Sequence, residues 1–564
     1  MNWPILLPLL AAYGREPDLA YRIERVVEPE LLVRVELTAS GDTDGATELA
    51  VQDRWGGVDA GGEDLGALAA RGAGGRELEV ERPAVHRWSV RHEPGETLEI
   101  TYEIAANAHQ ADAAPGANRR PIVNPEIFHA FGHLFLVVPE HLGLEERRTI
   151  TLEWRGFEKA ACSFAVGPGP HALELTLDEL RHAVFLAGEV ELLQRDVAGQ
   201  PVWIAAHDRG FAFRTAEFAD LVGGIVEIER EFFEDFERPF YLVTLIPVGV
   251  ARPGSQSLGG TGLVDSFALQ IQPGLDLAQA PDRQRLARLL AHEMFHDWNG
   301  TLLEREAPEE LAYWFSEGFT DFFARRLLLR GGWTTVDEHV ESLNATLRRY
   351  FTSPVRGEPN ARILADFWNE REVQDLPYQR GDVVAMILDH AIRRASAGER
   401  SLDDFMRELV RRARAPGEKR WKVSTEKLVE EVARWTSPEV ASAIRATVVD
   451  GATPFLDPAT FAPCLALAIE EEGVFDLGFD LERSTAERRV HGVRDGSAAS
   501  TVGLCDGQEL VGWSVNHGDT TSPVRFTIRE EGGERTIEYL PLGERVPVPR
   551  FSRARDGDAG CDVL

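Results

Sequence analysis

Apolar and polar residues alternate along the first third of the chain. Residues 20–27, 31–37 and 98–104 place an apolar side chain at about every second position, and glycine-rich stretches such as 59–62 separate such segments. A period of two puts the apolar side chains on one face of a strand, which is typical of antiparallel sheets. We therefore predict an N-terminal β-sandwich domain over residues 18–195.

A second domain, predicted over residues 200–455, changes from strand to helix patterns. It is expected to begin near Pro201 with a mixed sheet that includes the apolar run 241–246, and to continue as helices to about Arg445. Charged amphipathic stretches such as 426–432 are typical of solvated helices on the outside of a scaffold.

One of these helices ends in the motif His292-Glu293-Met294-Phe295-His296. From Pro281 onward, apolar residues follow helical spacing, and Gly300 suits the end of the helix. Residues four apart share one helix face, so His292 and His296 present two imidazoles with a carboxylate beside them, which is half of a catalytic zinc site. A pentapeptide also occurs by chance, and a helical histidine is more often a hydrogen-bonded core residue.

A second helix, predicted over residues 308–330, supplies a candidate third ligand. It carries Glu317 among closely spaced aromatic residues, which indicate a buried segment. A buried carboxylate needs a cation or a metal beside it. Two histidines and one glutamate leave zinc one open position for water, so we predict one Zn²⁺ per chain, bound by His292, His296 and Glu317.

A third segment, Pro377-Tyr378-Gln379-Arg380-Gly381, completes a set of motifs. With the motif at 292–296 and the stretch Trp314-Phe315-Ser316-Glu317-Gly318-Phe319-Thr320, it resembles the gluzincin aminopeptidases, and most closely the glycyl aminopeptidase family, family sixty-one of the metallopeptidases. The Trp298-Asn299 pair and the segment 202–207 extend the resemblance. The family implies a multidomain α+β fold with a thermolysin-like zinc peptidase domain and peptide substrates.

The resemblance also implies roles for single residues. Glu293 is expected to be the general base that takes a proton from the attacking water, and Tyr378 the donor to the developing oxyanion. A tyrosine at a helix start after Pro377 is the structural alternative for Tyr378. Gln379 stands where the family has a glutamate, which changes the local charge and leaves the phenol. Polar residues expected to orient the ligands are Asn299, Thr320 and Asp321.

A glycine-rich stretch departs from the family pattern. Where family members carry Gly-Gly-Leu-Glu-His, with a glutamate that holds the free amino group, this chain reads Gly259-Gly260-Thr261-Gly262-Leu263-Val264-Asp265. Asp265 is the candidate replacement because an ammonium that leaves water needs a carboxylate, and Gly259 and Gly260 are expected to line the substrate. A glycine-rich turn that enters an edge strand is an equal alternative.

Residues 462–545 resemble a PDZ domain. The stretch Asp476-Leu477-Gly478-Phe479 stands where such domains carry the loop that binds a peptide C-terminus through backbone N–H groups. Leu477, Gly478 and Phe479 are therefore the predicted peptide groove, with packing against the catalytic domain as the alternative. The remaining segment, 546–564, is expected to be a flexible tail.

Composition narrows the classes of function. The net charge of −33 over 564 residues argues against a nucleic-acid surface. Four scattered cysteines without C-x-x-C spacing predict neither a second metal site nor a disulfide scaffold. The apolar run 3–12 is too short to span a membrane and reads as a signal remnant or a packing extension, which leaves a cytoplasmic, periplasmic or secreted location open. No transmembrane segment is predicted.

The leading interpretation is a zinc-dependent aminopeptidase. An endopeptidase or dipeptide hydrolase with the same zinc site stays open because the glycine-rich stretch lacks its glutamate. A PDZ-based peptide-binding or quality-control protein with vestigial zinc, or a purely structural zinc site, would have no use for Glu293 or Tyr378.

Overall fold

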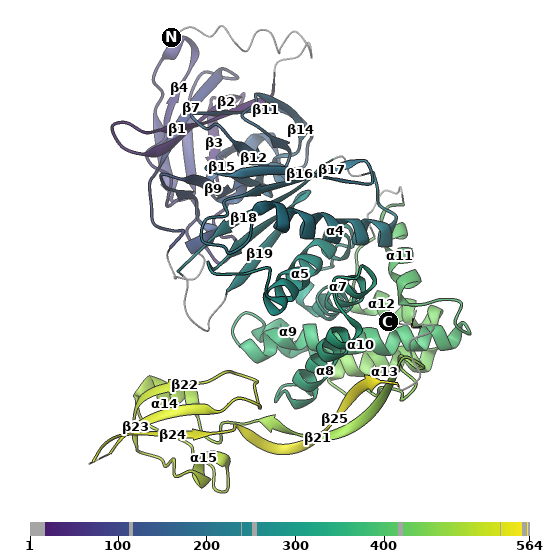
Figure 1. Cartoon of the computed structure of the whole chain (residues 1–564). Helices are drawn as coiled ribbons and strands as arrows, with labels where there is room; N and C mark the ends of the chain where they lie inside the picture. The colour runs from purple at the N-terminus through teal and green to yellow at the C-terminus, as the bar shows by residue number, and fades with distance from the viewer. Residues whose placement is uncertain are drawn as a thin grey trace. The chain divides into compact units, whose positions relative to one another are not determined.

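The computed structural model describes residues 17–111, 117–237, 240–250, 257–415, 421–530, 532–554, 561 and 564. Contacts divide the chain into two compact units, residues 1–294 and 295–564, and the division falls within helix α5 (Ala280–Phe295). Figure 1 follows the chain through both units.

Three sheets fill residues 19–188 of the first unit. The six-stranded sheet has the order β14 (His171–Leu175), β11 (Arg148–Arg155), β1 (Leu19–Val26), β2 (Leu32–Ser40), β7 (Thr97–Ala105) and β4 (Ala69–Arg71). The four-stranded sheet has the order β10 (Val138–Pro139), β3 (Ala46–Ala50), β6 (Arg87–Arg91) and β5 (Val80–Ala84). The five-stranded sheet has the order β13 (Ala165–Val166), β12 (Ala160–Cys162), β15 (Val184–Gly188), β9 (Ile127–Phe131) and β8 (Ile122–Val123). In β2 and β7 every second residue is buried, which confirms the predicted alternation.

A mixed five-stranded sheet follows in the same unit. Its order is β16 (Glu191–Val197), β17 (Gln200–Ala206), β18 (Tyr241–Pro247), β20 (Ser266–Ile271) and β19 (Leu258–Leu263), and helix α4 (Thr215–Phe233) packs on β16 and β17. Strand β18 is buried along its whole length, as its apolar run predicts. The predicted domain boundary near residue 200 lies inside this unit because residues of β9 and β15 share one core with residues of β17, β18 and β20.

The second unit begins with helices. They are α6 (Tyr313–Ser316), α7 (Gly318–Arg330), α8 (Val336–Thr352), α9 (Asn360–Asp366), α10 (Arg371–Ala395), α11 (Leu402–Ala413), α12 (Thr425–Trp435) and α13 (Pro438–Asp450). The prediction of one helix over 308–330 is wrong: a short 3-10 turn (Glu309–Ala312), α6 and α7 replace it, and Glu317 stands at the break.

The break at Glu317 coincides with a close crossing of helices. A Cβ atom added to Gly381 of α10 would lie 1.7 Å from the carbonyl oxygen of Trp314 and 2.9 Å from the Cα of Gly318. Only glycine at both positions lets the two backbones approach this closely. The crossing therefore fixes α10 against the residues on either side of Glu317.

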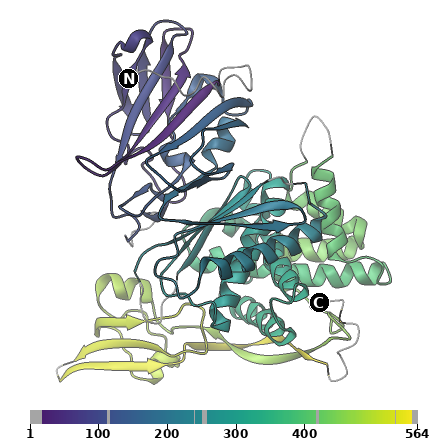
Figure 2. The same ribbon diagram turned by 45° about the horizontal axis from the view of Figure 1, so that its top comes forward.

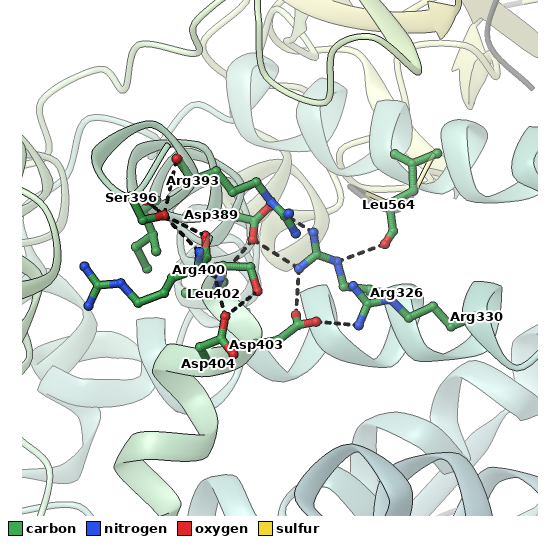
Figure 3. A network of polar contacts seen from close by, with 12 residues as sticks. Arg326, Arg330, Asp389, Arg393, Ser396, Arg400, Leu402, Asp403, Asp404 and Leu564 are labelled. Carbon is green, nitrogen blue, oxygen red and sulfur yellow. Dashed lines mark hydrogen bonds and ion pairs between the residues drawn. The ribbon is translucent and has the colours of Figure 1, made fainter. Parts of the chain in front are cut away.

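Buried ion pairs join α7 to α10 and α11. Arg325 forms a bidentate pair with Asp382, at 2.6 and 2.7 Å. Arg326 pairs with Asp389 and with Asp403, each at 2.9 Å, and its Nε donates to the carbonyl oxygen of Leu564 at 3.0 Å (Figure 3). Paired buried charges of this kind fix the register of neighbouring helices. No local sequence pattern predicts this network.

The end of the chain corrects two predictions. Strand β25 (Leu542–Arg553) pairs with β21 (Leu465–Phe475) as a long antiparallel ribbon (Figures 1 and 2), so the predicted flexible tail does not begin at residue 546. Cys464 and Cys561 form a disulfide, and the side chain of Leu564 is buried. The spacing of the cysteines did not predict this bridge, because Cys464 and Cys561 are 97 residues apart and meet only through the ribbon.

Between the two ribbon strands lies a small α/β region. Strands β22 (Glu509–Ser514), β23 (Val524–Glu530) and β24 (Gly533–Tyr539) form an antiparallel sheet, accompanied by α14 (Leu481–Glu487) and α15 (Ala498–Thr501) around one apolar core. The PDZ assignment of this region stays a prediction. Among the residues described, no helix combines the length and apolar character needed to cross a membrane.

Three buried histidines make stability depend on pH. Burial lowers the pKa values of His129, His133 and His339 to about 3. The unfolded chain then binds more protons below pH 6.5 than the folded chain, so stability falls as the pH drops from about 6.5 toward 3. We expect each histidine to remove about 1.4 kcal/mol of unfolding free energy at pH 5.5. Denaturant titrations at pH 7.5 and 5.5 would measure this loss, and His339→Gln would remove about one third of it, whereas the exposed His517→Gln would leave the loss unchanged.

Candidate metal centre

Three side chains predicted as zinc ligands converge. His292 and His296 are one turn apart at the end of α5, and each offers a ring nitrogen within 4.8 Å of the other and of a carboxylate oxygen of Glu317. The side chain of His292 is buried, and those of the other two are half-buried. Two imidazoles and one carboxylate form the donor set of a catalytic zinc site with an open position, so these residues fit the metal.

Hydrogen bonds set the orientation of His296. Its Nδ1 lies 3.1 Å from the carbonyl oxygen of Asn299, and its Nε2 lies 3.3 Å from Oε2 of Glu317. A proton on Nδ1, donated to that carbonyl, leaves the Nε2 lone pair free for a metal. The close approach of Nε2 to a carboxylate is what two ligands of one ion would show.

Asn299, predicted as an orienting residue, holds the segment that carries Glu317. Its buried side-chain amide donates to the carbonyl oxygens of Phe315 at 3.1 Å and Ser316 at 3.3 Å, and lies 3.1 Å from Oγ1 of Thr320. Thr320 is thus joined to the site through Asn299.

Two further residues lie close to Glu317 in the sequence: Asp321, which was predicted to orient a ligand, and Ser316, which was not predicted. The backbone N–H of Asp321 donates to the carbonyl oxygen of Glu317 at 2.9 Å, which joins Asp321 to the segment of this ligand. Ser316 donates from its hydroxyl to Oε1 of Glu317 at 3.0 Å. Only its position directly before Glu317 in the sequence could have indicated this contact.

Glu293, the predicted general base, is half-buried on α5 between the two histidines. Within the same unit its charge acts on Arg119, which the sequence did not single out. Burial lowers the pKa of Arg119, and the attraction of Glu293 opposes that change. Arg119 lies 174 positions upstream of Glu293, so no local motif links the two.

Tyr378, the predicted oxyanion donor, lies inside α10. The helix begins at Arg371 and includes Pro377, so Tyr378 does not stand at a helix start. It is half-buried and precedes by one turn the Gly381 that crosses Gly318 beside Glu317. The crossing thus anchors the turn of α10 that carries the phenol.

The glycine-rich stretch forms edge strand β19, as one of the two alternatives predicted. Gly259 and Gly260 pair with Gln270 and Leu269 of β20, and Asp265 occupies the tight turn between these strands with a φ of 42°. Gly260 lies three residues before the end of β19, which is about 10 Å at about 3.3 Å per residue, and Asp265 follows beyond that end. The structure therefore does not bring Asp265 together with the two glycines, and its role as amine anchor stays a prediction.

Two of the three residues predicted to form a peptide groove, Leu477 and Phe479, line a groove in the structure. A groove of about 590 Å³ is lined by Leu477, Phe479, Leu481, Thr485 and Trp513, among others. Gly478 has a φ of 80°, which glycine adopts readily, and it lies between the buried residues Leu477 and Phe479.

Comparison with known proteins identifies the segment around the metal ligands. Residues 285–366 match the family model described as M61 glycyl aminopeptidase. This match confirms the predicted resemblance over the part of the chain that carries the first two motifs.

Curated relatives are similar to this chain over a stretch of about the same short length as the family match. Glutamyl aminopeptidase of Bos taurus is 29% identical over 110 residues, and that of Rattus norvegicus is 30% identical over 111 residues, which is 19% and 20% of this chain. These matches span 11% of each relative's own length.

A solved structure resembles nearly the whole chain. An aminopeptidase N family protein from Idiomarina loihiensis has a TM-score of 0.70, covering 95% of this chain and 98% of that chain at 17% identity. At this identity the likeness concerns the fold, and it confirms a multidomain mixed α/β architecture.

The metal centre allows a direct test. We expect protein stripped with a chelator to bind one Zn²⁺, and His296→Ala to abolish tight binding because only two ligands remain. Asn299→Ala should weaken zinc affinity about 10- to 100-fold, since it releases the segment around Glu317. Calorimetric titration with Zn²⁺ measures both, and the exposed Asn369→Ala is the matched control. Equal affinity in Asn299→Ala and in that control would contradict the orienting role.

Proposed function

We propose that this protein is a zinc-dependent peptidase that removes N-terminal residues from peptides. The observation that carries the proposal is the convergence of His292, His296 and Glu317 with Glu293 between the two histidines. A purely structural zinc site does not need a general base such as Glu293 beside its ligands. The family match over residues 285–366 supports the same activity.

The mechanism follows from what each side chain can do. Zinc held by the three ligands would lower the pKa of a bound water and polarise the peptide carbonyl. Glu293 accepts a proton from the attacking water and transfers it to the leaving amine. Tyr378 donates a hydrogen bond where negative charge develops on the former carbonyl oxygen. Asn299 keeps His296 and the Glu317 segment in place, so the ligands need not reorganise during the reaction.

The substrate enters beside edge strand β19. Because β19 is the last strand of its sheet, an extended peptide can lie beside it as a further strand, next to the Gly260 carbonyl that accepts from Arg119. Asp265, in the turn that follows β19, remains the proposed partner of the free amino group. The missing glutamate in the glycine-rich stretch keeps an endopeptidase or dipeptide hydrolase as the alternative activity.

The domain organisation belongs to the same proposal. We assign a β-sandwich to residues 18–195, a thermolysin-like catalytic domain to 200–455 and a PDZ-like region to 462–545. The groove at Leu477 and Phe479 supports a second binding event, in which the loop takes a peptide C-terminus.

Matched peptides with free and acetylated N-termini decide between the activities. Incubation with the zinc-loaded protein, followed by mass spectrometry, should yield cleavage of the free peptides at their first bond only. Internal cleavage of the acetylated peptides would instead establish an endopeptidase. Absence of any cleavage would refute the proposed function.

A further inference from the structure

Arg119 is held in an unusual environment for a cation in this protein. It ends the 3-10 turn Ala117–Arg119, and its guanidinium carbon lies 5.9 Å from the ring centre of Trp55 and 5.7 Å from that of Phe131. One N–H donates to the carbonyl oxygen of Gly260 on edge strand β19 at 3.0 Å. Two aromatic rings and one backbone carbonyl thus fix the guanidinium at the glycine-rich edge.

Among the residues that the structure describes, the same guanidinium has no carboxylate partner. Within the described ranges, no carboxylate oxygen lies within ion-pair distance of Arg119, although the chain carries a net charge of −33. The next residue, Arg120, pairs with Asp64 at 2.7 Å and with Glu63 at 2.9 Å. Gly260 takes one of the five N–H donors of Arg119, so the planar fork that binds a carboxylate in two places remains available.

The described residues around Arg119 supply no other counter-charge. His129, whose side chain is fully buried, stays neutral because its pKa is about 3, lowered by burial and by the charge of Arg119. Neither of its ring nitrogens has a hydrogen-bond partner among the described residues. Glu293 acts on Arg119 only from beyond ion-pair distance. A half-desolvated cation without a carboxylate partner among the described residues favours an anionic ligand.

We infer that Arg119 binds a carboxylate of the peptide substrate and makes the enzyme select substrates that carry one near the scissile bond. The inference rests on the proposed function. A peptide that lies along β19 at Gly260 would lie next to the guanidinium of Arg119. Glu293, the proposed general base at the scissile bond, is close enough to Arg119 to interact with it electrostatically. Three carboxylates can reach such a position: the C-terminus of a dipeptide, an acidic second residue, or an acidic first residue.

Paired substrates separate these three sources. Ala-Ala against Ala-Ala-amide tests the C-terminus, Ala-Glu-amide against Ala-Gln-amide tests the second residue, and Glu-Ala-amide against Gln-Ala-amide tests the first. For the wild-type protein we expect kcat/KM to favour the carboxylate in at least one pair. Arg119→Gln should reduce that ratio about tenfold or more, because a charge-assisted bidentate contact is lost.

Two further variants complete the test. Arg119→Lys should keep part of the preference, since it retains the charge and loses the fork. Arg120→Gln, which removes the neighbouring paired cation, should leave every ratio at the wild-type value. Unfolding temperatures show whether each variant is folded, and calorimetry of Ala-Ala and Ala-Ala-amide binding to Glu293→Gln protein, with and without Arg119→Gln, measures the contact without turnover.

The outcomes are distinct. Wild-type protein that cleaves these peptides without any preference for a carboxylate, or ratios that Arg119→Gln leaves unchanged, would overturn the inference. An equal loss for both members of every pair, together with a shifted acidic limb of the pH profile, would also overturn it and make Arg119 a residue that positions Glu293. Absence of cleavage of all six peptides by the wild-type protein would refute the proposed function instead.

Discussion

Replacement of Glu293 by glutamine is expected to lower kcat for peptide hydrolysis about 10²- to 10⁴-fold while one zinc ion remains bound. The amide has nearly the same size as the carboxylate, so the end of α5 keeps its packing, but it cannot accept a proton from water. The three zinc ligands are unchanged, and the affinity for the metal should stay within a few-fold of the wild-type value.

The measurement combines initial rates on an unblocked peptide with the zinc content of the purified variant. Glu309→Gln is the matched control, because Glu309 is exposed and its pair with Arg305 at 2.9 Å contributes little. Full activity in the Glu293 variant would eliminate it as the general base and, with it, the mechanism proposed above.

A second large effect is expected for Gly381→Ala. The new methyl group would lie 1.7 Å from the carbonyl oxygen of Trp314, and backbone atoms on both sides of the crossing have no free space to move into. We expect a loss of about 3 kcal/mol or more of unfolding free energy, as for other strongly overpacked positions. Because Gly318 follows Glu317 directly, separation of the helices should also weaken zinc binding.

Gly223→Ala gives the matched control within another helix. There the added carbon meets only the side chain of Arg195, at 3.3 Å, and alanine favours a helix by up to about 1 kcal/mol over glycine. Denaturant unfolding of both variants separates the effects. An unfolding midpoint of Gly381→Ala equal to that of Gly223→Ala would show that the crossing can relax and does not hold the site together.

Local motifs explain why the metal ligands were predictable. His292 and His296 lie four residues apart on one helix, where spacing alone determines that they share a face. Glu317 was recognised through the aromatic residues around it, although the helix expected there is interrupted at that very residue. The close approach of Gly318 to Gly381 joins two segments more than sixty residues apart, so the residue pattern of either helix alone could not predict it.

Other parts of the site depend on chain topology. Arg119 reaches Gly260 and the neighbourhood of Glu293 only because strands from the first 200 residues share a unit with β19 and α5. The place of Asp265 in the turn after β19 likewise follows from the pairing of β19 with β20, and its role as amine anchor stays a prediction. These relations require the sheet register, which the sequence does not state.

The bridge between Cys464 and Cys561 closes residues 464–561 into a covalent ring. The strand register brings its ends together, since Leu465 pairs with Arg553 and the N–H of Ala554 donates to the carbonyl oxygen of Cys464 at 3.0 Å. A protease that cuts a loop inside this ring would open it without releasing a fragment. The nicked chain would keep its full mass on a gel until a reductant is added, so a single cut cannot shed the groove-bearing region from the helices that hold the metal ligand Glu317.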